Sequence, residues 1–231
     1  MNNQTTARWL AATLGAAVAA LAACGGGDGG LRPELQATDV PALATVASVS
    51  AFDGQALQPL SAAEAQSLAF MREEERLARD VYTSSALRWP AVPIFEKIAS
   101  SEATHTAAVK ALLDRYQLPD PMAGLPTGVF FTPDFQALHD ALVAFSSVSL
   151  VEALKVGARI EELDMRDIEA QKLEVDNGDI LRVYDNLLRG SRNHLRAFMK
   201  VLVQQGGSYT PQYISQEQFD RIVTSPIETG P

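Results

Sequence analysis

The chain has 231 residues, with 28 acidic side chains against 19 basic ones and a formal net charge of −9 at pH 7. This acidic balance argues against a nucleic acid partner, because nucleic acids are bound largely through Lys and Arg on their phosphates. With a single cysteine, neither a disulfide nor a thiolate metal site can form within one chain.

The first 23 residues have the features of an export signal. Arg8 is their only charge, and an apolar, alanine-rich run from Trp9 to Ala23 is too short for a typical membrane span. The run ends in Leu21-Ala22-Ala23-Cys24, which resembles the lipobox of a bacterial lipoprotein signal. The resemblance implies cleavage before Cys24 and a lipid on that cysteine. The alternative is an ordinary secretory signal in which the cysteine is incidental.

We therefore expect an exported protein of the bacterial cell envelope. Its lipid would anchor it to a membrane, with the folded domain facing the periplasm or the exterior. Residues 1–23 would be the signal peptide, and residues 24–58, rich in Gly, Ala, Pro and Ser, a flexible tether. Residues 59–225 are long enough for one domain with a substantial core.

Helix start and stop signals divide this domain into four main helices, expected near 62–87, 93–117, 150–173 and 178–204. The first and third begin at capping patterns, Ser61-x-x-Glu64 and Ser149-x-x-Glu152. More than thirty residues separate the second helix from the third, with a short amphipathic piece that ends near Phe145. Ser215-x-x-Gln218 predicts a short last helix. Strand signals are absent, and two helix pairs with one long crossover match the ferritin-like variant of the four-helix bundle.

Each main helix carries an apolar stripe, at alternating spacings of three and four, that is interrupted by polar residues near its middle. The stripes are Leu68, Met71, Glu75, Ala78, Tyr82; Phe95, Ile98, Glu102, His105, Val109, Leu112, Tyr116; Leu150, Leu154, Gly157, Glu161, Asp164, Ile168; and Ile180, Tyr184, Leu187, Ser191, His194, Phe198, Val201. Packed together, such helices would enclose a polar site between apolar layers.

Glu102 and His105 give the strongest indication of a metal. They lie three residues apart, so both side chains point the same way and can hold one ion between them. Burying two ionisable groups in an apolar seam is costly unless each has a partner, and a metal cation is a good partner. The pair E-x-x-H alone is a weak signal, and its position in the seam is what strengthens it.

At these residues the chain resembles the ferritin-like superfamily, and rubrerythrin most closely. The segment from Glu75 to Tyr82 is similar to the first ligand helix of rubrerythrin, and Glu102-x-x-His105 to the second. The segment from Lys155 to Asp164 resembles the third, more loosely. As a whole the domain is similar to an uncharacterised bacterial ferritin-like domain of unknown function. The resemblance implies two metal ions, iron or manganese, and no organic cofactor.

The fourth helix departs from that pattern. A di-iron protein of this superfamily would have Glu-x-x-His, whereas this chain has Ser191 three residues before His194, and a serine hydroxyl is a poor ligand for a hard cation. Asp164, one turn after Glu161, could supply the missing carboxylate. The expected metal ligands are therefore Glu75, Glu102, His105, Glu161, Asp164 and His194. Their four carboxylates would neutralise two divalent ions, which favours a dinuclear site.

Other interpretations of individual residues stay open. His194 could be a hydrogen-bonded core histidine, and Asp164 could pair with Arg79 or Arg166. We expect Tyr82 and Tyr184 to be core residues, although either could also donate to a ligand or relay a radical. The remaining expectations concern exposed side chains: Glu73, Glu74 and Glu162 on solvated helix faces, and His139 in the crossover.

The favoured function is a redox enzyme of the peroxidase or ferroxidase type, in which a dinuclear iron or manganese site reacts with peroxide or dioxygen. The chain lacks the four-cysteine iron module of rubrerythrin, so turnover would need an external reductant. One alternative is a non-catalytic iron-binding lipoprotein. Another is an interaction module that retains the bundle without redox chemistry. The sequence leaves the oligomeric state and the catalytic residues open.

Overall fold

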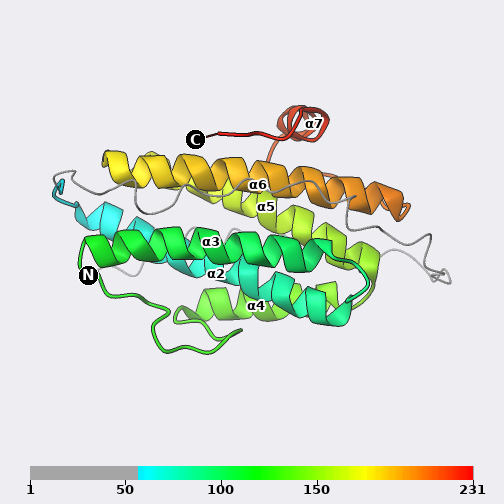
Figure 1. The fold of residues 1–231 in the computed structure, drawn as a ribbon, viewed down its shortest axis with the longest axis horizontal. Coiled ribbons are helices and arrows are strands. Elements are labelled where there is room, and N and C mark those ends of the chain that lie inside the picture. The colour runs from blue at the N-terminus through cyan, green and yellow to red at the C-terminus, as the bar shows by residue number, and fades with distance from the viewer. Residues whose placement is uncertain (1–56, 231) are drawn as a thin grey trace.

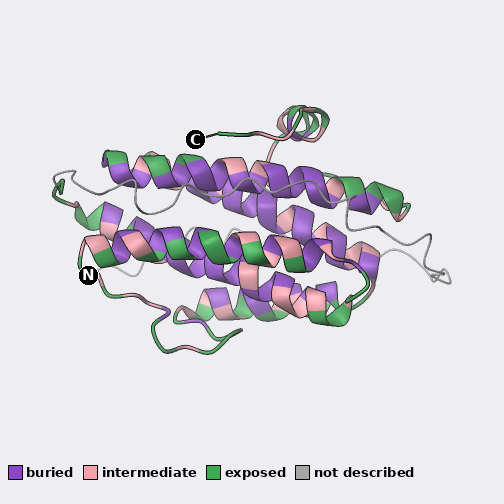
Figure 2. Ribbon diagram, in the orientation of Figure 1, coloured by how far each residue is buried: buried purple, intermediate pink, exposed green. Residues whose placement is uncertain are grey.

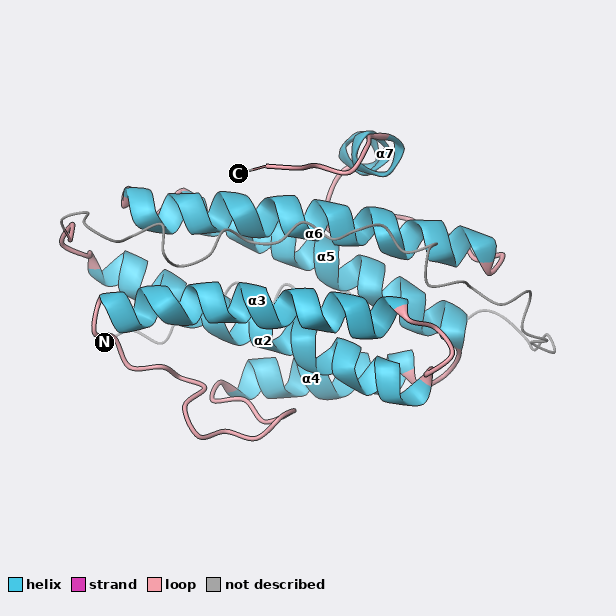
Figure 3. Ribbon diagram, in the orientation of Figure 1, coloured by secondary structure: helices cyan, strands magenta, loops and turns pink. Residues whose placement is uncertain are grey.

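The computed structural model describes residues 57–230, and in this part of the chain the only regular elements are helices, with no strand (Figure 3). The helices are α2 (Ala62–Arg88), α3 (Ile94–Arg115), α4 (Pro133–Ser146), α5 (Leu150–Lys172), α6 (Gly178–Gln204) and α7 (Gln216–Thr224). The prediction of an all-α domain is confirmed. The predicted signal peptide, Cys24 and nearly all of the tether lie outside the described residues. Among the described helices, none combines the length and apolar character needed to cross a membrane.

Four long helices lie side by side and form two antiparallel hairpins (Figure 1). The most extensive packing is within the hairpins, α2 on α3 and α5 on α6, and the hairpins meet through α3–α6 and α2–α5 contacts. The crossover between the hairpins carries α4, which packs against α2 and α5, and α7 packs on α6. Each long helix therefore turns one face toward the other three.

Side-chain caps fix where three of the four long helices begin, α2, α5 and α6. The Ser61 hydroxyl accepts a hydrogen bond from the Glu64 N–H, and the Glu64 carboxylate accepts one from the Ser61 N–H, which completes a capping box. Ser149 and Asn177 cap α5 and α6. Glu64 also accepts from the Asn177 N–H at 2.9 Å, which ties the start of α2 to the α5–α6 turn. Observed and predicted limits of the four long helices differ by at most two residues.

The inner faces of the long helices form the core, and Figure 2 shows buried residues along the length of these helices. Its largest fully buried side chains include Tyr82, Tyr184, Phe95, Phe198, Leu68, Met71, Ile98 and Leu112. These are residues of the predicted stripes, so the spacing pattern identified the buried faces correctly.

Glu73 and Glu74 are not on a solvated face as expected, because both side chains are buried. The crossover covers this side of α2, and Glu73 accepts hydrogen bonds from the Thr132 N–H at 2.9 Å and the Thr132 hydroxyl at 2.6 Å. Glu74 shares a hydrogen bond with Asp167 of α5. The expectation failed because a helix covered on more than one side buries polar residues beyond its apolar stripe.

The exposed positions expected for Glu162 and His139 are also wrong. Glu162 is completely buried, and one of its carboxylate oxygens accepts from the N–H groups of Gln212 and Tyr213 in the segment after α6. His139 is buried on α4, with its ring 5.2 Å from that of Phe130. Both side chains fix segments that carry no periodic pattern of their own.

Candidate metal centre

The polar middles of the four long helices meet inside the molecule. α2 contributes Glu75, α3 contributes Glu102 and His105, α5 contributes Glu161 and Asp164, and α6 contributes Ser191 and His194. All seven side chains are buried, and the exposed fraction of His105, Ser191 and His194 is 0%. Such a concentration of ionisable groups in a buried core is costly unless the groups are compensated.

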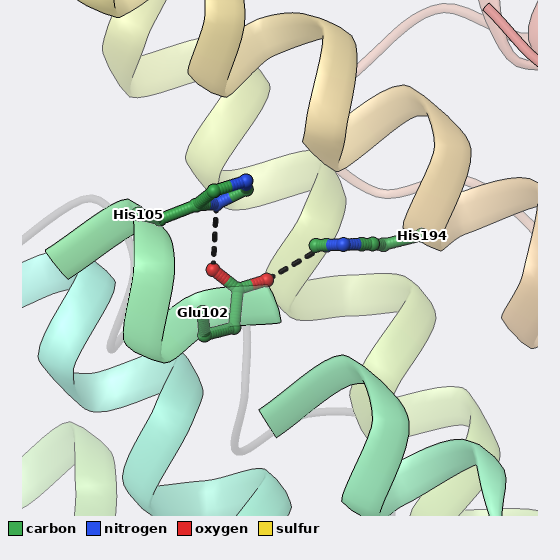
Figure 4. Close-up of side chains that lie close together, drawn as sticks. All are labelled: Glu102, His105 and His194. Carbon is green, nitrogen blue, oxygen red and sulfur yellow. Dashed lines mark ion pairs between the residues drawn. The ribbon is translucent and has the colours of Figure 1, made fainter. Parts of the chain in front are cut away.

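Glu102 lies between the two imidazoles (Figure 4). Its Oε2 is 2.8 Å from Nδ1 of His105, and its Oε1 is 2.7 Å from Nδ1 of His194. The two rings are 5.3 Å apart between centroids and are inclined by 25°. Ligand atoms of these three residues all lie within 4.8 Å of one another, so the group could hold a metal ion.

A further carboxylate lies beside each imidazole. Oε2 of Glu75 is 3.2 Å from Nδ1 of His105, and Oε2 of Glu161 is 3.4 Å from Nδ1 of His194. The arrangement is therefore close to symmetrical, with each half consisting of one imidazole nitrogen, one carboxylate of its own and one oxygen of Glu102.

Several of these atoms lack a hydrogen bond despite their burial. Among the described residues, each Nδ1 atom lies within 2.8 Å of a Glu102 oxygen but makes no hydrogen bond of normal geometry, and Oε1 of Glu75 and Oδ1 of Asp164 have no hydrogen-bond partner. Buried polar atoms are nearly always hydrogen-bonded, so each exception needs an explanation. Here the exceptions cluster, and a cation among them would supply the missing partner.

The outer atoms of several candidate ligands are fixed by hydroxyl groups. Tyr82 donates to Oε1 of Glu161 at 2.5 Å, Ser191 donates to Oδ2 of Asp164, and the Ser101 hydroxyl lies 2.9 Å from Nε2 of His194. The other oxygen of Glu161 and Nδ1 of His194 face the centre, and the other oxygen of Asp164 has no hydrogen-bond partner among the described residues. Asp164 does not pair with Arg79 or Arg166 as one interpretation had it, because Arg79 contacts Asp80 and Arg166 contacts Asp167.

Gly190 makes room for His105. A Cβ atom at Gly190 would lie 2.4 Å from Cε1 and 2.5 Å from Nε2 of the His105 ring, far closer than normal contact allows. The imidazole therefore packs directly on the α6 backbone. Sequence analysis missed Gly190 and Ser101; the only sign of Gly190 was a glycine in a helix interior, one turn before His194.

Comparison with known proteins identifies the family. The model of an uncharacterized protein domain, DUF2202, matches residues 64–226. The chain belongs to the DUF2202 family. The uncharacterized protein MJ0754 of Methanocaldococcus jannaschii is 50% identical over 173 residues, which are 75% of this chain and 93% of that protein. The crystal structure of hypothetical protein MJ0754 matches with a TM-score of 0.74 and 48% identity, covering 76% of this chain and all of that one.

The electrostatics of this DUF2202 domain are dominated by the buried centre. Burial raises the pKa of Glu75 to about 7 despite the neighbouring His105, and it raises the pKa of Asp164 well above its usual value, with Glu75 and Glu102 adding to the effect. At Glu102 burial acts in the same direction, but His105 and His194 outweigh it and hold the pKa well below its usual value. Glu102 is therefore the carboxylate that stays ionised most readily.

Burial has the opposite effect on the pKa of the two histidines, but it is outweighed by the carboxylates around them. Burial lowers the pKa of a histidine, but Glu102 and Glu161 outweigh burial at His194 and raise its pKa to about 9. Glu102 and Glu75 likewise hold the pKa of His105 well above its usual value. Without another cation, the centre therefore favours protons on its imidazoles and on part of its carboxyl groups.

Proposed function

We propose that this DUF2202 protein has a ferritin-like four-helix bundle and binds two iron or manganese ions at a dinuclear carboxylate centre. The ligands would be Glu75, Glu102, His105, Glu161 and His194, with Asp164 at the edge. One observation carries the proposal: Glu102 lies between two nearly equivalent half-sites, each with its own Nδ1 atom and its own carboxylate.

The donor set fits two hard divalent cations better than one. Carboxylate oxygens and imidazole nitrogens suit iron and manganese, and a single ion would leave one half-site uncompensated. Four carboxylates with two neutral imidazoles carry −4, which two divalent ions neutralise. Four of the atoms without a hydrogen bond, the two Nδ1 atoms, Oε1 of Glu75 and Oδ1 of Asp164, are atoms that such ions would use as ligands.

The residues around the centre orient the ligands. Tyr82 holds one oxygen of Glu161 and leaves the other facing His194, while Ser191 holds one oxygen of Asp164. A proton on Nε2 of His194, donated to Ser101, leaves the lone pair on Nδ1 directed at Glu102 and Glu161. These contacts fix side-chain rotamers before any ion binds.

Bound iron or manganese would supply redox chemistry toward peroxide or dioxygen, with electrons from an external reductant. The chain would act at the bacterial cell envelope, anchored through a lipid at Cys24. That location is supported by the Leu21-Ala22-Ala23-Cys24 motif and by the apolar run before it.

Metal analysis tests the centre directly. We expect close to two ions per chain in the purified protein, sharply reduced occupancy in Glu102→Ala, and normal occupancy in Glu96→Ala, a matched control on an exposed position of the same helix. Oxidation of bound Fe(II) on addition of dioxygen or peroxide would support the redox function. Stable Fe(II) would leave a non-catalytic iron-binding protein instead.

A second candidate is an interaction module without metal. It is favoured by the contacts of the two imidazoles, because each Nδ1 atom lies within 3.4 Å of two carboxylates and two imidazolium ions could satisfy much of the acidic charge. Failure of the wild-type protein to bind any divalent metal would select this candidate.

A further inference from the structure

Residues 225–230, the C-terminal strap, follow α7 and lie along the outside of α6 (Figure 1). The side chain of Asn193 on α6 binds the main chain of the strap. Nδ2 of Asn193 donates to the carbonyl of Glu228 at 3.0 Å, and Oδ1 of Asn193 accepts from the Glu228 N–H at 2.9 Å. Asn193 has no exposed surface. The strap is thus held much as a bound peptide would be.

Two arginines of α6 hold the Glu228 carboxylate. Arg192 donates to both of its oxygens, at 2.8 and 2.6 Å, and Arg196 donates to one of them at 2.7 Å. Paired N–H donors of this kind match carboxylate and phosphate groups alike. The outer side of α6, near its middle, therefore contains a formed anion site, and its present occupant belongs to the chain itself.

The guanidinium of Arg196 is fixed independently of Glu228. It donates to the Ile222 carbonyl at 2.8 Å, to the Ser225 hydroxyl at 2.7 Å and to Oδ1 of Asn193 at 2.7 Å. Arg196 as a whole is only 9% exposed. The contacts with Ile222 and Asn193 do not involve the strap, so loss of the Glu228 carboxylate would leave the Arg196 guanidinium held in place, which lowers the entropic cost of binding another anion.

A third arginine, Arg221 of α7, lies beside the site that holds the Glu228 carboxylate. Arg192, Arg196 and Arg221 line an open depression of about 280 Å³, together with Glu228 and Ser225. Arg221 forms an ion pair with Glu217 one turn away, but both side chains are more than two-thirds exposed. Exposed pairs of this kind contribute little, so Arg221 can turn to a better anion at small cost.

We propose that this depression is a binding site for a small dianionic oxyanion, a phosphate or phosphomonoester group, and that Glu228 occupies the site when the ligand is absent. A carboxylate carries one negative charge and contacts two of the guanidinium groups. A tetrahedral dianion carries twice that charge and presents oxygens in enough directions to accept from all three. Its binding displaces Glu228 and frees the strap from α6.

Titration with inorganic phosphate tests the site, with sodium chloride at matched ionic strength as the reference. Full-length wild type should bind phosphate saturably, and Glu228→Gln, which removes the competing charge, should bind at least about tenfold more tightly. Arg221→Gln should bind at least about tenfold more weakly, since it removes the donor that only the dianion uses. Lys200→Gln, which removes a charge from an exposed position elsewhere on α6, should match wild type.

Hydrogen exchange of the Glu228 amide reports on the strap, because that N–H is protected by Asn193. Phosphate should accelerate its exchange in wild type. Glycerol 3-phosphate in a parallel titration shows whether the site takes the free ion or an esterified group, and saturable binding of either supports the proposal. Absence of saturable binding in both wild type and Glu228→Gln, or unchanged affinity in Arg221→Gln, overturns it and leaves the strap a structural clamp.

Discussion

Gly190→Ala tests the metal centre without changing any candidate ligand. The added methyl group would lie 2.4 Å from Cε1 of His105, whereas an ordinary contact begins near 3.4 Å. The ring must therefore withdraw by about 1 Å, and it has little space because His105 is fully buried. Its Nδ1 atom now lies 2.8 Å from Glu102 and 3.2 Å from Glu75, and a shift of this size disrupts that half-site.

Two opposing effects set the stability of the metal-free variant. Overpacking a core costs about 1–3 kcal/mol, whereas alanine in place of glycine within a helix gains about 0.5–1 kcal/mol. The net loss should therefore be about 0–2.5 kcal/mol, so the variant still folds. The effect on metal binding should be larger than the effect on stability, because the His105 imidazole would be displaced from its half-site. The His194 imidazole would stay in place. Occupancy should fall from two ions toward one.

The assay is metal content per chain together with the rise in Tm on adding Fe(II) or Mn(II). Gly178→Ala is the control, because Gly178 begins the same helix and a Cβ there would meet nothing within 4 Å. It should retain wild-type occupancy. A Gly190→Ala protein that binds two ions with wild-type affinity would refute the role assigned to the His105 half-site.

Three further predictions follow from the same reasoning. Chelation should lower the Tm, and Fe(II) or Mn(II) at a hundredfold excess over Kd should restore about 2.7 kcal/mol of stability for each site that fills; Glu102→Ala should show no such rise. The pKa of Glu75 is raised to about 7 and that of His194 to about 9, so the folded, metal-free protein binds more protons than the unfolded chain between about pH 5 and 9. Its Tm should fall across that window in a pH series, and a rising Tm would contradict the cited shifts. Mass spectrometry of the mature protein should find a lipid-modified Cys24 at its N-terminus, and an unmodified residue or cleavage elsewhere would exclude the lipoprotein assignment.

The buried faces of the long helices could be predicted, because apolar residues spaced three and four apart mark the face of a helix that is buried. Stripes such as Leu68, Met71, Glu75 follow the side of α2 that faces its neighbours, and the capping residues mark the helix starts. The polar interruption of each stripe placed the candidate ligands at similar depth. These are local signals, readable from residues three and four apart.

The remaining polar contacts could not be predicted, because they depend on segments that lie far away in the sequence. Glu73 is buried by Thr132, and Glu162 is buried by residues 212 and 213. Nothing near either glutamate in the chain indicates such a cover. The contacts of the strap could not be predicted for the same reason. In the sequence, Asn193 and Arg196 are ordinary polar residues of a helix, and only the structure brings Glu228 against them.

Ser191 departs from the ferritin-like pattern, and its contact with Asp164 would keep the proposed dinuclear centre neutral. Where the ferritin-like resemblance leads one to expect a glutamate, the serine hydroxyl donates to Asp164 of the neighbouring helix. A glutamate at that position beside Asp164 would bring five carboxylates to a centre with two imidazoles, one negative charge more than two divalent ions neutralise. With serine the count stays at four, and the hydroxyl holds one oxygen of Asp164 while the other has no partner among the described residues. In the proposed dinuclear centre, Asp164 of α5 would therefore take the place of a glutamate on α6, and Ser191 would orient it.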